Sequence, residues 1–377
     1  MPASQNYCIG CFRWRNLQLS FAVRPIFLYI YSMNDKRIEA IDVLRGITMA
    51  LMVLVNSPGS WSVRYPMLRH AQWNGFTPTD FVFPCFLFLM GVSMFFSLRK
   101  GSFTLSRKIL RRFLLLLGLG VLVNVIGMLV NGRFAFENIR WMGVLQRFGL
   151  CFGVTAVLVC KLPHKWLGWV AAGLLAGYSA LLLLGNGYAQ DASSIIARVD
   201  SAVLGETHLY RWGNGIDPEG LLSTIPAIAH TLIGFLVGKI LYQRDFRKMD
   251  ALGTALLVAG FLLLWLLPVN KKIWSPSFVL LICGMGILLL SLLQWLIDEN
   301  HYWKRTGFWK VFGTNAIYCY LMSDVMAWTW HLTGFQSWAM EQVPVTEFTS
   351  LLFALFCVGL IWLTALPLYK KKIYLKL

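Results

Sequence analysis

The chain has 377 residues, of which 57% are hydrophobic and 14% charged. Soluble domains are about 25% charged, so this composition, with a mean hydropathy of +0.62, excludes a soluble globule and predicts a polytopic membrane protein. The net charge of +17 is better explained by cytoplasmic loops than by nucleic acid, because the basic residues fall in short clusters between apolar runs, with no nucleic-acid-binding motif around them.

The first 33 residues differ from the rest and mix Cys, Arg and aromatic residues without a clear membrane span. Their apolar piece, 21–31, is too short for the core of a signal peptide with a cleavage site. Met33 is followed by NDKRIEAIDVLRG, a natural cytoplasmic start for a first helix. We hypothesise that translation begins at Met33, so that 1–33 is an untranslated extension and 34–377 is one transmembrane domain.

Ten apolar stretches of spanning length follow in chain order. They cover residues 39–57, 79–98, 109–130, 141–160, 166–185, 220–242, 250–268, 275–297, 312–331 and 348–368. Five basic clusters, near 99–112, 161–165, 244–248, 304–310 and 370–376, fall on one side of the membrane if the helices alternate. The positive-inside rule puts that side, and both termini, in the cytoplasm. The expected fold is therefore an all-α polytopic membrane protein with about ten transmembrane helices.

The longest loop on the opposite side, near 186–219, is the least apolar part of the chain and contains Gly, Asn, Asp and Pro. Those residue types predict a folded loop. Six of the eight cysteines lie inside apolar runs and are expected to be small buried hydrophobes. Cys8 and Cys11 form a lone CxxC, which is weak support for a metal or redox site. No metal site is expected.

The first helix carries a stripe of polar and soft residues. Asp42, Arg45, Met49 and Asn56 are spaced by 3, 4 and 7, which places them on one helical face. Asp42 and Asn56 would lie about 21 Å apart along the helix axis. The plainer interpretation is a surface ion pair between Asp42 and Arg45 at the inner interface. The functional one is the wall of a path through the protein, since polar groups in membrane helices usually face a cavity or a partner.

The segment LRHAQWNGFTPTDFVFPCFLFLMG brings His70, Trp73 and Asn74 to the outer side, just before the second span. A histidine can take a proton from an amine or hydroxyl, or accept an acyl group. By itself a loop histidine is more often only solvated. Asp80 has two open interpretations, as a cap of the second helix beside Pro78 or as a partner of His70.

Gln146 and Arg147 lie inside the fourth span. An intramembrane arginine is costly and suggests a functional site. The alternative is a structural pair with an acid such as Asp324 or Asp42. His230 inside its apolar run is expected to be a hydrogen-bonded core histidine.

Nucleotide-binding and HExxH motifs are absent from the sequence. The residues by themselves leave a transporter and a membrane enzyme about equally supported. However, the segments IDVLRGITMALMVLVNSPGS and LRHAQWNGFTPTDFVFPCFLFLMGVS resemble the heparan-α-glucosaminide N-acetyltransferase family and its bacterial relatives. Five further segments resemble the family in the same order along the chain: RWMGVLQRFGLCF, VDSAVLGETHLY, IDPEGLLSTIPAI, PVNKKIWSPSFVL and FGTNAIYCYLMSD. The resemblance therefore covers residues 36–370.

The resemblance implies a transmembrane acyltransferase fold that passes an acetyl group from cytoplasmic acetyl-CoA to an amino sugar across the membrane. The family's active-site histidine matches His70, and its asparagine at the end of the first helix matches Asn56. The family's LQR and FGTN patterns match Gln146, Arg147 and Asn315, which we assign to cofactor binding together with Asp42 and Arg45.

These assignments predict a reaction path. Arg45 and the basic 99–112 loop would hold the phosphates of CoA, and the pantetheine arm would run along the first helix. His70 would act as general base or carry the acetyl group transiently. Asn56 would donate a hydrogen bond to the thioester oxygen, and Asp80 would orient His70.

The acceptor is expected to be an amino sugar or an envelope glycan in a bacterial periplasm, with the chain in the inner membrane. Trp73, Asn74, Asp217 and Glu219 are the expected substrate-binding residues, and Trp212 and Asn214 belong to the same acidic outer loop. A homodimer is plausible from the family. The alternative functions are a sugar or solute transporter on the same scaffold and a family member that only binds.

Overall fold

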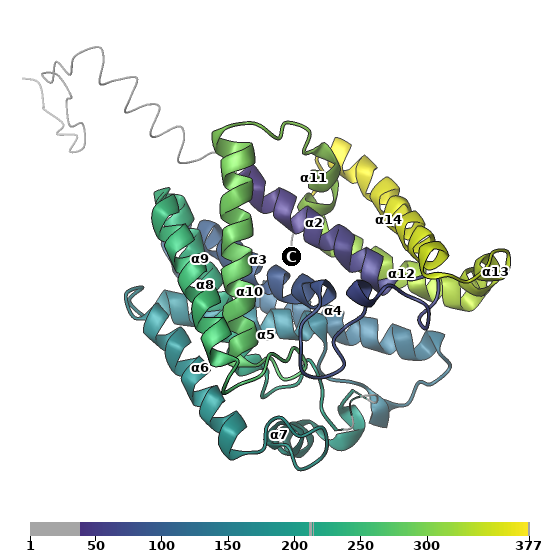
Figure 1. Ribbon diagram of the computed structural model, residues 1–377, viewed down its shortest axis with the longest axis horizontal. Helices are drawn as coiled ribbons and strands as arrows, with labels where there is room; N and C mark the ends of the chain where they lie inside the picture. Colours follow the sequence, from purple (N-terminus) through teal and green to yellow (C-terminus); the bar gives the residue numbers. More distant parts are fainter. Residues whose placement is uncertain (1–37, 211–212, 214, 376–377) are drawn as a thin grey trace, which may run out of the picture. The chain divides into compact units, whose positions relative to one another are not determined.

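The computed structural model describes residues 38–210, 213 and 215–375 (Figure 1). The 1–33 extension, its CxxC, Trp212 and Asn214 lie outside the described residues. Within them, ten helices have 18 residues or more. They are α2 (Glu39–Asn56), α3 (Pro78–Arg99), α4 (Arg107–Val130), α5 (Val144–Lys161), α6 (Leu167–Leu184), α8 (Thr224–Gln243), α9 (Phe246–Leu263), α10 (Pro276–Leu293), α12 (Ala316–Thr333) and α14 (Glu347–Lys370).

Seven helices of the described part are long and apolar enough to span a bilayer: α3, α4, α5, α6, α8, α10 with its extension to Glu299, and α14. The expected all-α, multi-pass membrane protein is therefore confirmed. The count of ten spans and the cytoplasmic placement of the termini stay predictions. The stretch 312–331 is not one continuous helix, because Asn315 separates α11 (Gly307–Thr314) from α12.

Shorter elements fill the connections. They are η1 (Pro66–Leu68), η2 (Phe136–Asn138), α7 (Ile195–Leu204), η3 (Glu206–His208) and α13 (Phe335–Glu341), and a π-helical turn η4 (Gln294–Glu299) continues α10. The predicted folded loop 186–219 is therefore built around α7 and η3. Five of the six cysteines in apolar runs are buried and Cys160 is half-buried, and all six are free thiols.

Helix α2 lies between two groups of helices. Figure 1 shows α8, α9 and α10 side by side on one side of α2, and α11 and α14 on the other; α2 contacts α3 and α10 as well as α11 and α14. The start of α2 is held by Asp298 of η4, whose carboxylate accepts hydrogen bonds from the backbone N–H groups of Glu39 and Ala40 at 2.9 and 3.0 Å. This contact caps the helix and holds its first turn against η4, the continuation of α10.

Two glycines let α2 and α11 touch through their backbones. A Cβ on Gly46 would stand 1.9 Å from the carbonyl oxygen of Trp309, and a Cβ on Gly313 would stand 1.8 Å from that of Asp42. Small residues allow such close approach in membrane helix pairs. The contact places the Gly313 carbonyl beside the side chains of the α2 stripe.

The opposite ends of the helices are joined by two loops, 57–77 and 264–275. The N–H of Gly75 donates to the carbonyl of Val269 at 2.8 Å, and Asn270 Nδ2 donates to Asn74 Oδ1 at 3.2 Å. Tyr188, which follows α6, donates its hydroxyl proton to the carbonyl of Pro268 at 2.9 Å. These bonds bring together loops that are far apart in the sequence and form the floor of the His70 site.

Candidate active site

His70 and Asp80 form a hydrogen-bonded pair at the start of α3. His70 Nδ1 donates to Asp80 Oδ1 at 2.7 Å. A carboxylate only accepts, so Nδ1 carries the proton and Nε2 keeps its lone pair when the imidazole is neutral. The His70 side chain is 50% exposed and that of Asp80 is 1% exposed. The pair thus presents a histidine to the surroundings on a buried, oriented carboxylate.

Asp80 also caps α3. Its Oδ2 accepts from the backbone N–H groups of Ala71 at 3.0 Å and Thr77 at 3.2 Å, and Thr77 with Asp80 forms a capping box. Asp80 is therefore both the cap of α3 and the partner of His70, because one carboxylate oxygen caps the helix and the other accepts from His70. Formation of α3 thus fixes the position of Asp80, the partner of His70.

Lys271, which the sequence analysis did not select, completes this site. Its Nζ lies 3.1 Å from His70 Nδ1 and 3.4 Å from Asp80 Oδ1, and its side chain is 18% exposed. Burial lowers the pKa of Lys271, although Asp80 and Glu219 oppose this. The sequence held one signal for it, since Lys271 lies inside the motif PVNKKIWSPSFVL.

A second charged cluster, Arg140 with Asp217 and Glu219, lies at the same end. Arg140 binds Asp217 through two nitrogens, with Nε donating to Oδ2 at 2.9 Å, and its Nη2 donates to Glu219 Oε2 at 2.6 Å. Burial opposes the charge of Arg140, but Asp217 and Glu219 raise its pKa above the ordinary value. Bidentate geometry makes this a strong, oriented ion pair.

The two expected acceptor-binding carboxylates are not equivalent. Asp217 is fully buried and also accepts from the N–H groups of Tyr210 and Glu219 at 3.0 and 2.9 Å, so its oxygens are occupied in holding the loop. Glu219 is 16% exposed. Burial would raise the pKa of Glu219, but Arg140, Arg147 and Lys271 hold it below the ordinary value. Glu219 therefore remains ionised close to Lys271.

Arg147 is fully buried at the same end of the helices. Its Nη2 donates to the carbonyl of Gly220 at 2.9 Å and to Ser223 Oγ, and its guanidinium lies 4.9 Å from the Trp274 ring centre. A pair with Asp324 or Asp42 was wrong: Arg147 makes no ion pair with either among the described residues. Arg147 instead ties α5 to the turn that begins α8.

Gln146 packs between α4 and α5. A Cβ on Gly120 would stand 2.4 Å from Gln146 Oε1, and the buried Nε2 has no hydrogen-bond partner among the described residues. His230, expected to be a hydrogen-bonded core histidine, is fully buried beside the backbone carbonyl of Pro84, with which it interacts. Both side chains occupy the packed interior.

The remaining cofactor candidates lie at the other end of α2. Arg45 Nη1 lies 3.2 Å from Asp42 Oδ1 and donates to the Gly313 carbonyl at 3.2 Å, while Nη2 donates to Ser93 Oγ at 2.7 Å. Arg45 thus joins α2, α3 and α11, and its side chain is 24% exposed. Ser93 follows Asp80 by 13 residues on α3, which separates the two sites by about 20 Å.

Asn315 is fully buried near this end. Its Nδ2 donates to the carbonyl of Ile373 at 3.1 Å, and its Oδ1 accepts from the N–H of Leu375 at 3.0 Å. The amide is therefore engaged on both sides with the segment after α14. That position connects Asn315 with the Arg45 end through the neighbouring Gly313.

Asn56, Trp73 and Asn74 surround the His70 end without contacting His70 through a recorded hydrogen bond. Asn56 is the exposed last residue of α2. Trp73 donates its indole N–H to the carbonyl of Tyr188 at 3.0 Å, and Asn74 accepts from Asn270. Trp73 and Asn74 are thus anchored within the site floor.

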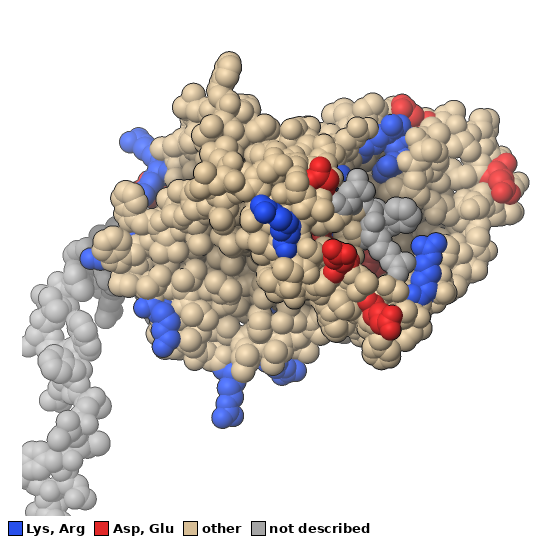
Figure 2. All heavy atoms as spheres, turned by 90° about the horizontal axis from the view of Figure 1, so that it is seen from below, with Lys and Arg blue, Asp and Glu red and all other residues tan. Residues whose placement is uncertain are grey.

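The site has no recognisable metal centre in the described part of the chain, where no three His, Cys, Asp or Glu side chains could hold an ion together. Figure 2 shows the face seen from below Figure 1; its visible Asp and Glu side chains lie in one half, whereas Lys and Arg spread over both.

Comparisons with known proteins identify the family of the chain. A sequence model of the family described as heparan-alpha-glucosaminide N-acetyltransferase, catalytic, matches residues 37–268. The heparan-alpha-glucosaminide N-acetyltransferase of Homo sapiens is 30% identical over 90% of this chain and 60% of its own length. The protein of the same name from Mus musculus is 29% identical over 91% of this chain and 61% of its own. The chain thus spans about three fifths of the relatives it matches, and it belongs to the heparan-alpha-glucosaminide N-acetyltransferase catalytic family.

Proposed function

We propose that the protein is a transmembrane acetyltransferase that moves the acetyl group of cytoplasmic acetyl-CoA to an amino sugar on the opposite side of the membrane. The observation that carries the proposal is the His70–Asp80 pair beside Lys271, with the Arg45 cation about 20 Å away along α3. A base at one face and a phosphate-binding cation at the other suit a long acyl donor that enters from one side. Membership of the family supports the same reaction.

His70 acts at the acceptor. Its Nε2 takes the proton of the sugar amine as the amine nitrogen bonds to the acetyl carbon, and the proton then passes to the sulfur of the departing CoA. The products are an amide and free CoA. In the alternative sequence Nε2 first bonds to the acetyl carbon while the C–S bond breaks and CoA leaves as the thiolate; the amine then takes the acetyl group while the bond to Nε2 breaks, and the amine proton neutralises the thiolate. Asn56 would donate a hydrogen bond to the thioester oxygen in either case.

Asp80 and Lys271 support His70. Asp80 fixes the Nδ1–H tautomer and stabilises the imidazolium that forms when Nε2 takes a proton. Lys271 stabilises the buried carboxylate, and its cation lies close enough to the site to favour negative charge that develops on the thioester oxygen. Glu219, held ionised, would attract the positively charged acceptor amine.

The donor would bind along α2. Arg45, paired with Asp42, and the basic 99–112 loop are the proposed contacts of the CoA phosphates, since guanidinium groups bind phosphate bidentately. Asn315 would act by holding the segment after α14 beside this end. Gln146 and Arg147 lie at the His70 end, so their proposed role moves from donor phosphates to supporting the turn that carries Glu219.

The acceptor is proposed to be an amino sugar or an envelope glycan, because the family is named for transfer to a glucosaminide. Trp73 and Asn74 would contact it beside His70. The positive-inside argument places His70 on the periplasmic face of a bacterial inner membrane, with both termini in the cytoplasm. A homodimer remains part of the proposal on family grounds.

Purified full-length protein in proteoliposomes tests the proposal. Acetyl-CoA should be consumed, and free CoA thiol released, only when glucosamine is supplied on the His70 side. His70→Ala should lower the rate by about 10²- to 10⁴-fold, whereas His331→Ala, an exposed histidine on α12, should leave it near the wild-type value. Uptake of intact sugar without release of CoA would favour the transporter instead.

A further inference from the structure

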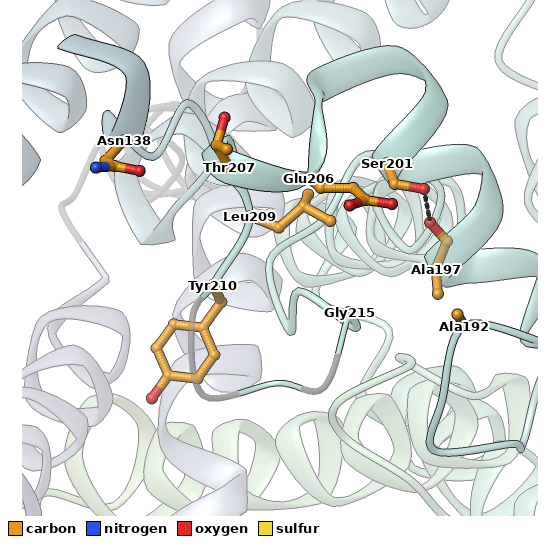
Figure 3. A pocket seen from close by; sticks show the side chains of 9 residues that line it. All are labelled: Asn138, Ala192, Ala197, Ser201, Glu206, Thr207, Leu209, Tyr210 and Gly215. Carbon is orange, nitrogen blue, oxygen red and sulfur yellow. Dashed lines mark hydrogen bonds between the residues drawn. The ribbon is translucent and has the colours of Figure 1, made fainter. Parts of the chain in front are cut away.

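A cavity of about 430 Å³ lies beside α7, away from the His70 pair, and is lined by residues of η2, α7, η3 and the following loop. Figure 3 shows Asn138 and Thr207 at one side, Ser201 and Ala197 at the other, Glu206 and Leu209 between them, and Tyr210 below. Its volume falls in the range of about 300–1,000 Å³ typical of ligand pockets.

Several polar side chains line the cavity: Asn138, Ser201, Glu206, Thr207 and Tyr210. No hydrogen bond is recorded among the described residues for the side chains of Asn138, Glu206 and Thr207, or for the Tyr210 hydroxyl, whereas Ser201 donates to the Ala197 carbonyl at 2.7 Å and can still accept. One carboxylate, one amide and several hydroxyls around an aromatic ring are the chemistry that recognises a sugar. The single carboxylate, Glu206, favours a sugar that carries an ammonium group.

The floor of the cavity is fixed by contacts that reach the candidate active site. His208 Nδ1 donates to the carbonyl of Ile139 at 2.7 Å, which holds η3 against the residue after η2. Tyr210 lies with its ring 4.8 Å from the Arg140 guanidinium, and Arg140 in turn binds Glu219. The cavity and the His70 site therefore belong to the same end of the protein and are joined through one ion-pair cluster.

We propose that this cavity is a second sugar-binding subsite, which holds a glucosamine unit of an oligosaccharide acceptor while another unit of the same chain reaches His70. The inference rests on the amino-sugar acceptor of the proposed function. Glu206 binds the ammonium group, Asn138 and the hydroxyls bind the ring hydroxyls, and Tyr210 offers its ring to the apolar face of the sugar. A glycan of two or more sugars is then a better acceptor than free glucosamine.

Direct binding tests the subsite without the reaction. Full-length protein in detergent is titrated calorimetrically with a glucosamine tetrasaccharide in the absence of acetyl-CoA. Glu206→Gln should raise the Kd about tenfold or more, because it removes a charge-assisted hydrogen bond. Asn138→Ala should also weaken binding. Glu137→Gln, an exposed neutralisation on η2 outside the cavity lining, should bind as the wild type does.

A fully N-acetylated tetrasaccharide, which lacks the ammonium groups, serves as the matched ligand. It should bind more weakly to the wild type and should lose little further affinity in Glu206→Gln. The subsite is overturned if the wild type does not bind the glucosamine tetrasaccharide, or if Glu206→Gln and Asn138→Ala bind it as tightly as Glu137→Gln does.

Acetyl transfer then separates the subsite from the proposed function. In Glu206→Gln, the ratio of kcat/KM for the tetrasaccharide to kcat/KM for glucosamine should fall about tenfold, and in Glu137→Gln it should not change. Binding without any acetyl transfer by the wild type would reject the acetyltransferase and leave the subsite standing. Transfer with an unchanged ratio in Glu206→Gln would reject the subsite and leave the acetyltransferase standing.

Discussion

His70 Nδ1 lies 2.7 Å from Asp80 Oδ1, and the other oxygen of the same carboxylate caps α3. The histidine is therefore oriented by a residue whose position is set by the start of a membrane helix. Because helix α3 packs extensively on α8, the carboxylate has little freedom to move. A base held in this way keeps one tautomer and one ring orientation throughout a reaction.

Replacing Asp80 with Asn should separate its two tasks. The amide oxygen of Asn can still accept at the helix start, whereas the negative charge that stabilises protonated His70 is lost. We expect kcat to fall by about 10²-fold or more with a smaller change in KM. Steady-state kinetics of CoA release measure this. Asp80→Ala should in addition lower thermal stability by the loss of a cap, about 0.5–2 kcal/mol; equal kcat in Asp80→Asn and wild type would contradict the orienting role.

Lys271→Met should lower kcat about tenfold, because Asp80 loses its buried counter-charge and the site loses a cation. Lys248→Met, at an exposed lysine on α9, is the control and should remain near wild type. Lys271→Arg should restore part of the rate, since the guanidinium keeps the charge.

The pH profile of the Lys271 variants is a separate test. Burial lowers the pKa of Lys271, so its ammonium is lost at a lower pH than that of an exposed lysine. Wild-type activity should therefore decline as pH rises through that lowered pKa. The decline should move to higher pH in Lys271→Arg, and an identical alkaline limb in both proteins would rule out a role for the ammonium.

Arg45→Met should weaken the binding of the acetyl-CoA donor but not the binding of the sugar acceptor. Loss of one guanidinium contact to phosphate should raise the KM for acetyl-CoA about tenfold, with the KM for the sugar unchanged. Because Arg45 also binds Ser93 and the Gly313 carbonyl, a thermal unfolding measurement must accompany the kinetics. Arg247→Met, an exposed arginine near the start of α9, is the control, and an equal rise in both KM values would argue against a donor site here.

Asp200 should make thermal stability pH-dependent. Burial, with a further contribution from Asp217, raises its pKa from 3.8 to about 6, although the Leu222 N–H opposes this. The folded protein thus binds more protons than the unfolded one between these values, so stability is full below the unfolded pKa and falls as pH rises through about 6. The shift corresponds to about 2–3 kcal/mol.

Unfolding temperatures in detergent between about pH 4 and 7 measure this effect. Asp200→Asn should remove the corresponding part of the change in unfolding temperature with pH. Asp250→Asn, which replaces an exposed carboxylate on α9, should leave that change as in the wild type. An unchanged slope in Asp200→Asn would assign the pH dependence to other groups.

The helices were predictable from sequence to within a few residues because their signal is local. A run of about 20 apolar residues can satisfy its backbone in a membrane only as a helix, and each of the ten predicted stretches overlaps one long helix. The exception, the break at Asn315, arises because its amide bonds to the segment after α14. That partner lies about 60 residues away, as the separations of 58 and 60 show.

The features of the candidate site likewise divide into those that neighbouring residues predict and those that depend on distant contacts. The pairing of Asp42 with Arg45 follows from helical spacing, and the cap at Asp80 follows from the Thr-Pro-Thr-Asp pattern. The sequence marks Arg147 as unusual but not its partners, Gly220 and Ser223, since a buried charge needs partners without the sequence showing which groups reach it.

What the sequence by itself determined is therefore the membrane class, the helices and the choice of His70 as a candidate, because apolar length, helical period and local motifs are properties of neighbouring residues. Only the tertiary structure decided that Lys271, 201 residues from His70, stands beside it, and that Asp217 is occupied by Arg140. Such contacts are set by how the loops at the ends of packed helices meet, and no local spacing records that geometry.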